Sequence, residues 1–232
     1  LPLVRAIARR LPESRRFVTP HANVVMAGHG RRLWLLAATA LLMSVFLAPA
    51  SQFTNEYLRD ERGFSAARIT LFTILTTLPG AAGIVVGARL ADVRGRRVVG
   101  AVGVAGGVGA TVAMYHFQGW PLWAASAVGS VVGTATVPAL GVYGPELFPT
   151  SLRGRANGIV GGFGRAGSVI GLVAAGWLAD SAGRLGPALS VLALGPAIVA
   201  LLVLAAYPET AHRELEDLNP EDRRPDEPGH TG

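Results

Sequence analysis

The chain contains no cysteine and no lysine, and charged residues make up only 16% of its 232 positions. The absence of cysteine excludes disulfides and thiolate metal sites, and it leaves the redox compartment unreadable. Charged residues usually supply about a quarter of a soluble domain, so this chain is depleted in them. An ordinary water-soluble domain is therefore a poor description of it.

Glycine and uninterrupted apolar stretches are what the chain has in excess, with 30 glycines and 50% hydrophobic residues. Residues 98–145 hold no Asp, Glu or Arg, and charge clusters close both ends of that stretch. A membrane helix needs about 20 apolar residues. The stretch therefore fits two spans joined by a turn at 116–121, which puts both charge clusters on one face of a membrane.

Apolar runs bounded by charge predict an all-α membrane protein with six spans. Five of the six runs carry no formal charge. The exception is the fifth run along the chain, whose one charged residue is Arg165. The third and sixth are apolar nearly all round. The predicted spans are 33–53, 69–88, 98–117, 120–143, 156–179 and 185–207.

The distribution of arginine predicts the orientation. Sixteen of the 21 arginines fall on one side of the predicted spans and four on the other, with Arg165 between them. The arginine-rich side is expected to be cytoplasmic, with both termini there, in the plasma membrane of a bacterium (its inner membrane). Short basic loops between apolar runs indicate topology, not nucleic-acid binding. Residues 1–32 are expected to be a cytoplasmic segment, 33–207 the helix bundle, and 208–232 a disordered cytoplasmic tail.

Two internal repeats indicate how the bundle is built. Leu-Ala-Asp-x-x-Gly-Arg occurs at 90–96 and again at 178–184, three spans later and on the opposite face. This is the pattern of a 3+3 inverted repeat in secondary transporters. Pro12-Glu-Ser and Pro208-Glu-Thr lie 196 residues apart, one six-span unit. The chain also starts at Leu, not Met, and we therefore take it to be a fragment or a processed product.

These motifs resemble the major facilitator superfamily, specifically its carboxyl-terminal six-helix half. The superfamily's loop signature is matched at six positions and departs from the pattern at Ala88 and Val93. A second signature, Glu-x-x-Pro-x-x-x-Arg, resembles that of sugar and organic-acid porters and is matched from Glu146 to Arg153. The resemblance covers residues 10–215 and implies proton-coupled transport by alternating access. The six matched positions are Leu90, Ala91, Asp92, Gly95, Arg96 and Arg97.

The two charge clusters predict a cytoplasmic latch, in which arginine–carboxylate pairs hold helix ends together in one state and release them in another. Gly95 would supply a turn that a residue with Cβ resists. The alternative is that the arginines only fix topology. The predicted latch residues are Asp92, Gly95, Arg96, Arg97, Glu146 and Arg153.

Arg165 is the leading candidate for substrate contact, because an arginine near the membrane midplane costs about 2.5–3.5 kcal/mol to insert. Helical spacing aligns it with Asn157, Gly161 and Ser168. The alternative is a side chain that snorkels to the cytoplasmic loops or pairs with Glu146. Further candidates are Gln52 and Asn55 on the first span, and Ser130 and Thr134 on the fourth.

For each hydroxyl, bonding within its own helix is the competing interpretation. Four pairs of glycines at four-residue spacing predict close helix packing in place of ligand contact: Gly83/Gly87, Gly103/Gly107, Gly129/Gly133 and Gly158/Gly162.

The sequence therefore favours half of a secondary active transporter for a small organic acid. We expect no enzymatic activity, no cofactor and no metal. The expected partners are the substrate, protons, the lipid bilayer and a missing amino-terminal six-helix half, with no nucleic acid. Sugar transport, drug-type efflux and a non-transporting six-span module are the alternatives.

Overall fold

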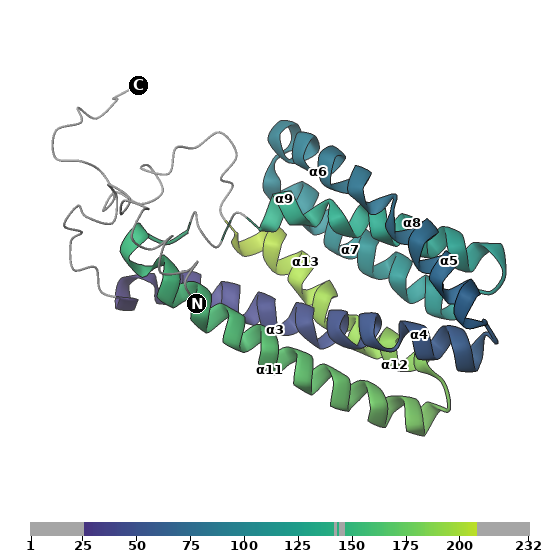
Figure 1. The fold of residues 1–232 in the computed structure, drawn as a ribbon. Coiled ribbons are helices and arrows are strands. Elements are labelled where there is room, and N and C mark those ends of the chain that lie inside the picture. The colour runs from purple at the N-terminus through teal and green to yellow at the C-terminus, as the bar shows by residue number, and fades with distance from the viewer. Residues whose placement is uncertain (1–25, 142, 144–146, 208–232) are drawn as a thin grey trace, which may run out of the picture.

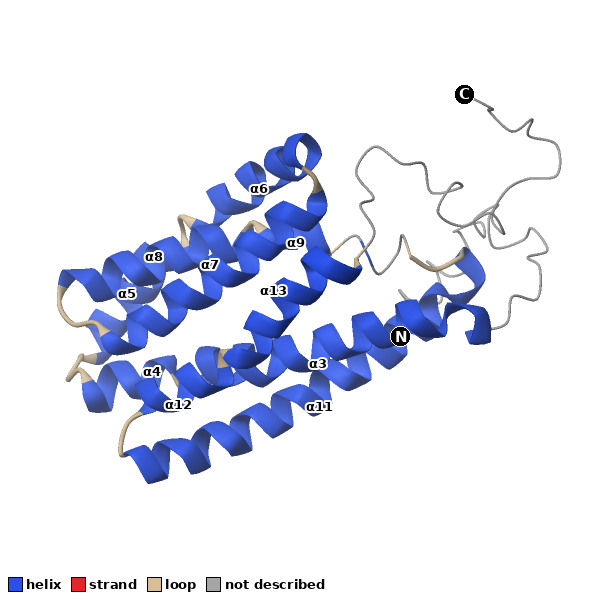
Figure 2. Ribbon diagram, turned by 180° about the vertical axis from the view of Figure 1, so that it is seen from behind, coloured by secondary structure: helices blue, strands red, loops and turns tan. Residues whose placement is uncertain are grey.

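The computed structural model describes residues 26–141, 143 and 147–207, and these residues form helices with no strand among them (Figure 2). Six helical stretches are long and apolar enough to cross a membrane. The prediction of six spans is thus confirmed, although the first, second and fifth are longer than expected. Their bounds are Gly30–Glu61, Ala66–Arg94, Arg96–His116, Trp120–Leu140, Ser151–Ala182 and Leu185–Ala206.

Four of the six spans are interrupted, three of them at a proline or in the turn before one, whereas the first breaks after Pro49, which lies inside α3. Proline lacks a backbone N–H and its ring clashes with the preceding turn, so a helix breaks or kinks there. The breaks separate α3 (Gly30–Gln52) from α4 (Thr54–Glu56) and the π-helix η2 (Tyr57–Glu61), α5 (Ala66–Thr77) from α6 (Gly80–Arg94), α8 (Trp120–Thr134) from α9 (Thr136–Leu140), and α12 (Leu185–Leu192) from α13 (Leu194–Ala206). The third and fifth spans, α7 (Arg96–His116) and α11 (Thr150–Ala182), are continuous. A 3-10 turn, η1 (Met26–His29), precedes the first span.

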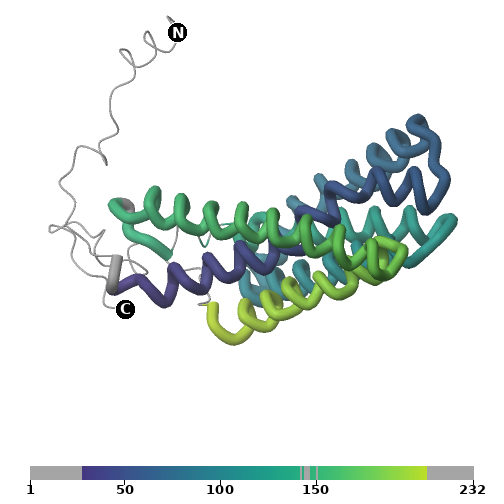
Figure 3. Tube along the Cα trace, turned by 90° about the horizontal axis from the view of Figure 1, so that it is seen from below, coloured from purple at the N-terminus to yellow at the C-terminus, as the bar shows by residue number. Residues whose placement is uncertain are grey.

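The bundle is arranged around α13, which lies between α3 and α7 (Figure 1). The fifth span, α11, runs along α3, and α3 in turn lies between α11 and α13 in Figure 3. The helices α5, α6, α8 and α9 pack with α7 on the other side. The third and sixth spans are consequently the most enclosed, with 39% and 44% of their most apolar window buried, against 17% for the fourth and fifth.

The two ends of the bundle differ in chemistry. One end, called the Arg-rich end below, carries the turn at Gly95 with Arg94, Arg96 and Arg97 and the start of α11. The other, the far end, carries the end of η2, the turn 117–119 and the turn at Gly183. Gly95 has φ 92° and Gly183 has φ 68°, both in the region that favours glycine. The repeated motif thus makes a glycine turn at each end of the bundle (Figure 1).

Glycines let neighbouring helices meet at backbone distance. A Cβ at Gly107 would lie 2.7 Å from the Cα of Gly133, and one at Gly87 would lie 2.7 Å from the Cβ of Ala135. The packing expected of the first three glycine pairs is therefore present. The expectation for Gly158 and Gly162 is wrong within the described part of the chain, where a Cβ at either position would meet no other segment within 4 Å.

The fifth span packs through glycines that are not among the four predicted pairs. Gly164, Gly167 and Gly171 face α3, and a Cβ at Gly171 would lie 2.7 Å from the carbonyl carbon of Val45. Gly83 meets the carbonyl of Val131 on α8 in the same way. Gly83 and Gly171 are 88 residues apart, the spacing of the repeated motif, so the inverted repeat is expressed in helix packing as well as in sequence.

Two matched glycine substitutions test this packing. Gly171→Ala should lower the free energy of unfolding by about 1–3 kcal/mol, because its methyl group meets the backbone of α3. Gly162→Ala, on the open face of the same helix, should raise it by up to about 1 kcal/mol, because alanine favours the helix. Thermal unfolding of the purified protein in detergent measures both. Equal effects of the two substitutions would contradict the α3–α11 contact.

Candidate functional site

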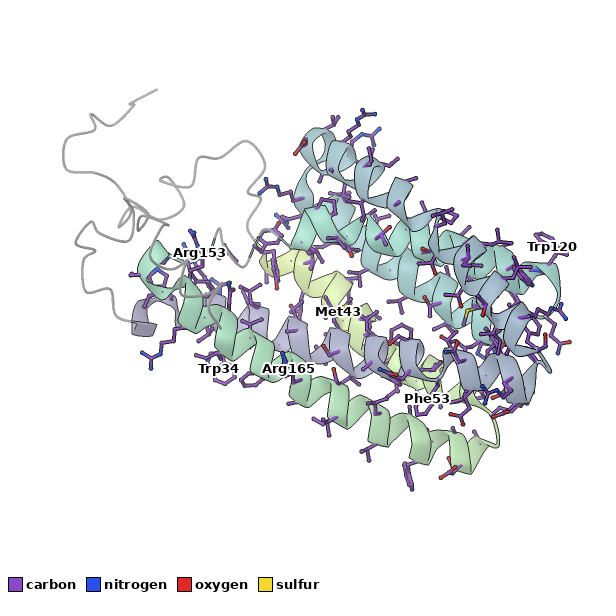
Figure 4. All side chains as sticks on the ribbon, in the orientation of Figure 1. Trp34, Met43, Phe53, Trp120, Arg153 and Arg165 are labelled. Carbon is purple, nitrogen blue, oxygen red and sulfur yellow. The ribbon has the colours of Figure 1, made fainter. Side chains whose placement is uncertain are left out.

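Arg165 lies in the middle of α11, as the sixteenth of its 33 residues. Figure 4 shows it between Arg153 at the Arg-rich end and Phe53 toward the far end. Its side chain is exposed, as are Asn157 and Gly161 on the same helical face. Among the described residues none accepts a hydrogen bond from its guanidinium. The residue expected to bind substrate is thus available on an open surface of the unit.

Two exposed tryptophans locate Arg165 in depth, since tryptophan favours the membrane–water interfaces. Leu41 meets Gly167 and Val45 meets Gly171, which gives a constant register of 126 residues between the parallel helices α3 and α11. Trp34 is therefore level with residue 160. Trp177 lies 17 residues farther along, or about 26 Å at the helical rise, close to the thickness of the hydrocarbon core. Between these markers Arg165 lies about 5 Å from the midpoint, toward the Arg-rich end.

The other predicted contact residues do not gather around Arg165. By the same register, Gln52 is level with residue 178, about 20 Å from Arg165 along the helix. Gln52 and Asn55 are exposed at the end of the first span. Ser168 lies one turn from Arg165, but its hydroxyl donates to the carbonyl of Gly164 at 3.1 Å, within α11. Ser168 is therefore the one predicted contact residue that lies within a helical turn of Arg165.

Ser130 and Thr134 face the break in the second span. Thr134 Oγ1 lies 2.7 Å from the carbonyl oxygen of Gly80 and 2.8 Å from that of Ser130, and Ser130 Oγ donates to the carbonyl of Thr77 at 3.3 Å. Proline at position 79 interrupts the helical ladder at this point. Both hydroxyls therefore bind backbone oxygens here, which is a packing role. Their contact with substrate stays a prediction.

At the far end, a pocket of about 360 Å³ lies between the end of the first span and the α11–α12 turn. Four carboxylates and one guanidinium line it together with two aromatic rings. The sequence held a signal for it, because Glu56, Asp60 and Glu61 follow an uncharged span, but the partner segment is more than 100 residues away. The lining residues are Phe53, Glu56, Tyr57, Asp60, Glu61, Gly176, Ala179, Asp180, Gly183, Arg184 and Leu185.

Charged side chains hold both ends of the sixth span. At the far end, the backbone N–H of Leu185, the first residue of α12, donates to Glu61 Oε1 at 2.8 Å. A carboxylate at a helix N-terminus satisfies a free N–H and opposes the positive end of the helix dipole. At the Arg-rich end, Arg97 donates to the carbonyl of Leu204 in the last turn of α13. The cation thus sits at the negative end of the same span.

The remaining latch residues lie at the Arg-rich end. Arg153 donates to the carbonyl of Phe148 at 3.4 Å, and Arg32 donates to the carbonyl of Leu147 at 3.2 Å. Asp92 is exposed in the last turn of α6, and Gly95 makes the expected turn. Glu146 lies outside the described residues. The latch therefore stays a prediction, with Arg97 attached to the sixth span in this structure.

Comparison with known proteins decides the class. The profile of the Major Facilitator Superfamily matches residues 33–227. The chain belongs to the Major Facilitator Superfamily. An MFS-type transporter of Aspergillus flavus, lnaF, is 34% identical over 154 residues. That match covers 62% of this chain and 30% of the relative, so the chain spans well under two thirds of the relative's length.

Membership in the superfamily, together with the six apolar helices, makes the chain a multi-pass membrane protein of a transporter family. It also accounts for the motif in the α6–α7 turn, which the sequence resemblance had identified at Asp92, Gly95, Arg96 and Arg97. Among the described residues no three His, Asp or Glu side chains are placed to hold a metal ion.

A near-isosteric substitution tests the packing role of Thr134. Thr134→Val removes the hydroxyl and leaves the carbonyl of Gly80 without this donor, so the free energy of unfolding should fall by about 1 kcal/mol. Ser168→Ala, which removes a bond inside one helix, should change it by less. Thermal unfolding in detergent compares the two. A change in the substrate KM of Thr134→Val without any loss of stability would instead favour substrate contact.

Glu61 gives a second test through the amide of Leu185. Glu61→Ala should lower the free energy of unfolding by about 1 kcal/mol and speed hydrogen exchange at Leu185, because the helix N-terminus loses its acceptor. Glu61→Gln keeps an acceptor oxygen and should lose less. Asp180→Asn, a neighbouring exposed carboxylate, is the control. Exchange at Leu185 that is the same in all three variants would rule out the cap.

Proposed function

We propose that this chain is the second six-helix half of a secondary active transporter that carries a small organic acid across the plasma membrane by alternating access. In this proposal both termini and the Arg-rich end are cytoplasmic, and transport is coupled to protons. The amino-terminal half is a separate part of the full protein, for which the greater length of the relative leaves room. The observation that carries the proposal is the exposed guanidinium of Arg165 near the middle of the fifth span.

Arg165 supports an anionic substrate for an electrostatic reason. A cation inside the hydrocarbon region is costly unless an anion or water compensates it. The carboxylates of the described residues all lie near the ends of the spans, at Glu56, Asp60, Glu61, Asp92 and Asp180. A substrate carboxylate that reaches Arg165 would supply the missing charge through two parallel hydrogen bonds.

The same distribution of charge bears on proton coupling. No carboxylate occurs at mid-depth in the described spans, so a proton-carrying group at that depth is expected in the first half. Asp92, Gly95, Arg96, Arg97, Glu146 and Arg153 would form the cytoplasmic latch that opens and closes with the transport cycle. The proposed latch rests on the loop motif and on the position of its described residues at the Arg-rich end.

One observation favours a different substrate charge. The far-end pocket combines Phe53 and Tyr57 with four carboxylates and only Arg184 as a cation. Such a pocket would attract an organic cation and repel a carboxylate. Drug-type efflux of a cationic amphiphile is therefore the second candidate. Sugar transport and a non-transporting module have no comparable support.

Flux through the full-length protein in proteoliposomes tests the proposal. Labelled lactate, malate and citrate are compared with glucose and with a cationic dye, each with and without an imposed proton gradient. One of the carboxylates should be transported, and Arg165→Gln should reduce its kcat/KM by at least about tenfold. Arg165→Lys keeps the charge but loses bidentate geometry, so its kcat/KM should lie between those of the wild type and Arg165→Gln.

Arg155→Gln is the matched control, since it removes an exposed arginine nearer the end of the same helix. Carboxylate flux that Arg165→Gln leaves unchanged would identify Arg165 as a residue that only snorkels to the interface. If only the cationic dye is transported, the substrate class is an organic cation and not an organic acid. Absence of flux for every compound tested would count against the proposed substrate classes.

A further inference from the structure

We propose that the far-end pocket is a binding site for a small organic monocation that carries an aromatic or branched apolar group. The cation would enter from the water at the far end and lie between the end of the first span and the α11–α12 turn. This inference goes beyond the proposed function, because the pocket is remote from Arg165 and its occupation does not depend on which substrate is carried.

The register between α3 and α11 places the pocket near the membrane surface. Phe53, one of its walls, is level with residue 179 by this register, and Ala179 is another wall. From Arg165 to that level the helix rises about 21 Å, and Figure 4 shows Phe53 toward the far end. Trp177 marks the interface on this side, and Asp180 lies beyond it. A cation dissolved in water can therefore reach the pocket without entering hydrocarbon.

The pocket carries negative charge that the unit itself leaves largely uncompensated. Glu56, Asp60 and Asp180 are exposed, and none of them forms a hydrogen bond or an ion pair with another described residue. Glu61 accepts one hydrogen bond, from the N–H of Leu185 at 2.8 Å. Four carboxylates and the single guanidinium among the lining residues leave a formal charge of −3. A concave surface with this charge concentrates cations.

The spacing of the carboxylates favours an organic ion over a metal ion. Mg²⁺ and Ca²⁺ need several oxygen ligands at about 2.0–2.6 Å. No three acidic or histidine side chains in the described part of the chain are close enough together to supply them. The volume of about 360 Å³ instead falls within the range of small-molecule sites, about 300–1,000 Å³. A cation with a body of its own, and with its charge spread over several atoms, fits this arrangement.

Phe53 provides the wall for the apolar part of the ligand. Its side chain is half-buried, so part of the ring is available to a bound molecule. Tyr57 offers less, because it is fully buried, with its ring 4.6 Å from that of Tyr115 and 4.8 Å from the guanidinium carbon of Arg62. Aromatic faces attract ammonium groups, and quaternary ammonium ions in particular. One ring and several unpaired carboxylates therefore select for an ammonium ion with an apolar substituent.

Isothermal titration calorimetry on the full-length protein in phosphatidylcholine nanodiscs tests the site. The probe is benzyltrimethylammonium. Phenylacetate, with the same ring and the opposite charge, and the neutral benzyl alcohol are the comparison ligands. Only the ammonium ion should bind saturably, with a Kd on the order of millimolar or tighter. Magnesium chloride at the same concentration should not displace it.

Substitutions on the two sides of the pocket should weaken binding of the probe. Asp60→Asn on the first span and Asp180→Asn on the fifth should each raise its Kd about 3–10-fold, because each removes one nearby negative charge. Phe53→Leu keeps an apolar side chain but loses the aromatic face, so it should raise the Kd about 2–5-fold. Thermal unfolding checks that each variant is folded, and the remaining variants decide if one is not.

Two arginine substitutions separate the pocket from the general charge of the far end. Arg184→Gln and Arg59→Gln each remove one positive charge there, but only Arg184 lines the pocket. Arg184→Gln should lower the Kd of the probe, whereas Arg59→Gln should leave it nearly unchanged. Equal effects of the two would overturn the inference in favour of a diffuse surface field. Absence of saturable binding, equal binding of phenylacetate, or displacement by magnesium would also overturn it. No flux is measured, so the result is independent of the proposed transport of an organic acid.

Discussion

The structure depends on the backbone carbonyls that are released where membrane helices break. In hydrocarbon such a group has no water to bind, so a protein donor must replace the lost N–H. The break after α3 leaves the carbonyl of Ala50 to the hydroxyls of Thr54 and Tyr115. At the break between α5 and α6, Ser130 supplies a donor to the carbonyl of Thr77 in the same way. Several of the polar side chains in these spans are therefore part of the fold.

This requirement explains why the fold was more predictable than the site. Six spans, their order and the turn at Gly95 follow from local sequence, because length, hydropathy and glycine act within a few residues. A hydroxyl in a span has the same hydrogen-bonding chemistry whether it binds substrate or a backbone carbonyl of a neighbouring helix. Choosing between them requires knowing which helix lies opposite, as with Thr134 and Gly80. That information is a tertiary contact and has no local pattern.

The long-range bonds of the sixth span show the same limit. Glu61 and Arg97 bind residues more than 100 positions away, at the two ends of α12–α13. In sequence, Arg97 belongs to a loop motif and Glu61 to an ordinary polar turn. Only their placement at opposite ends of one helix dipole reveals that their charges are complementary to it. The expectation that the third and sixth spans are apolar all round was correct in composition, yet these are the spans most enclosed by the unit.

Arg165 has none of these structural roles among the described contacts. Tyr57, Tyr115, Thr134 and Glu61 each contact a backbone group of another helical segment. Arg165 instead faces open space from a helix whose opposite side is a glycine contact with α3. A cation at that depth is costly unless water, an anion or snorkelling to the interface offsets the cost. In the proposed function, a charged substrate and a carboxylate of the first half would offset this charge in turn, and alternating access would let them exchange at the same guanidinium.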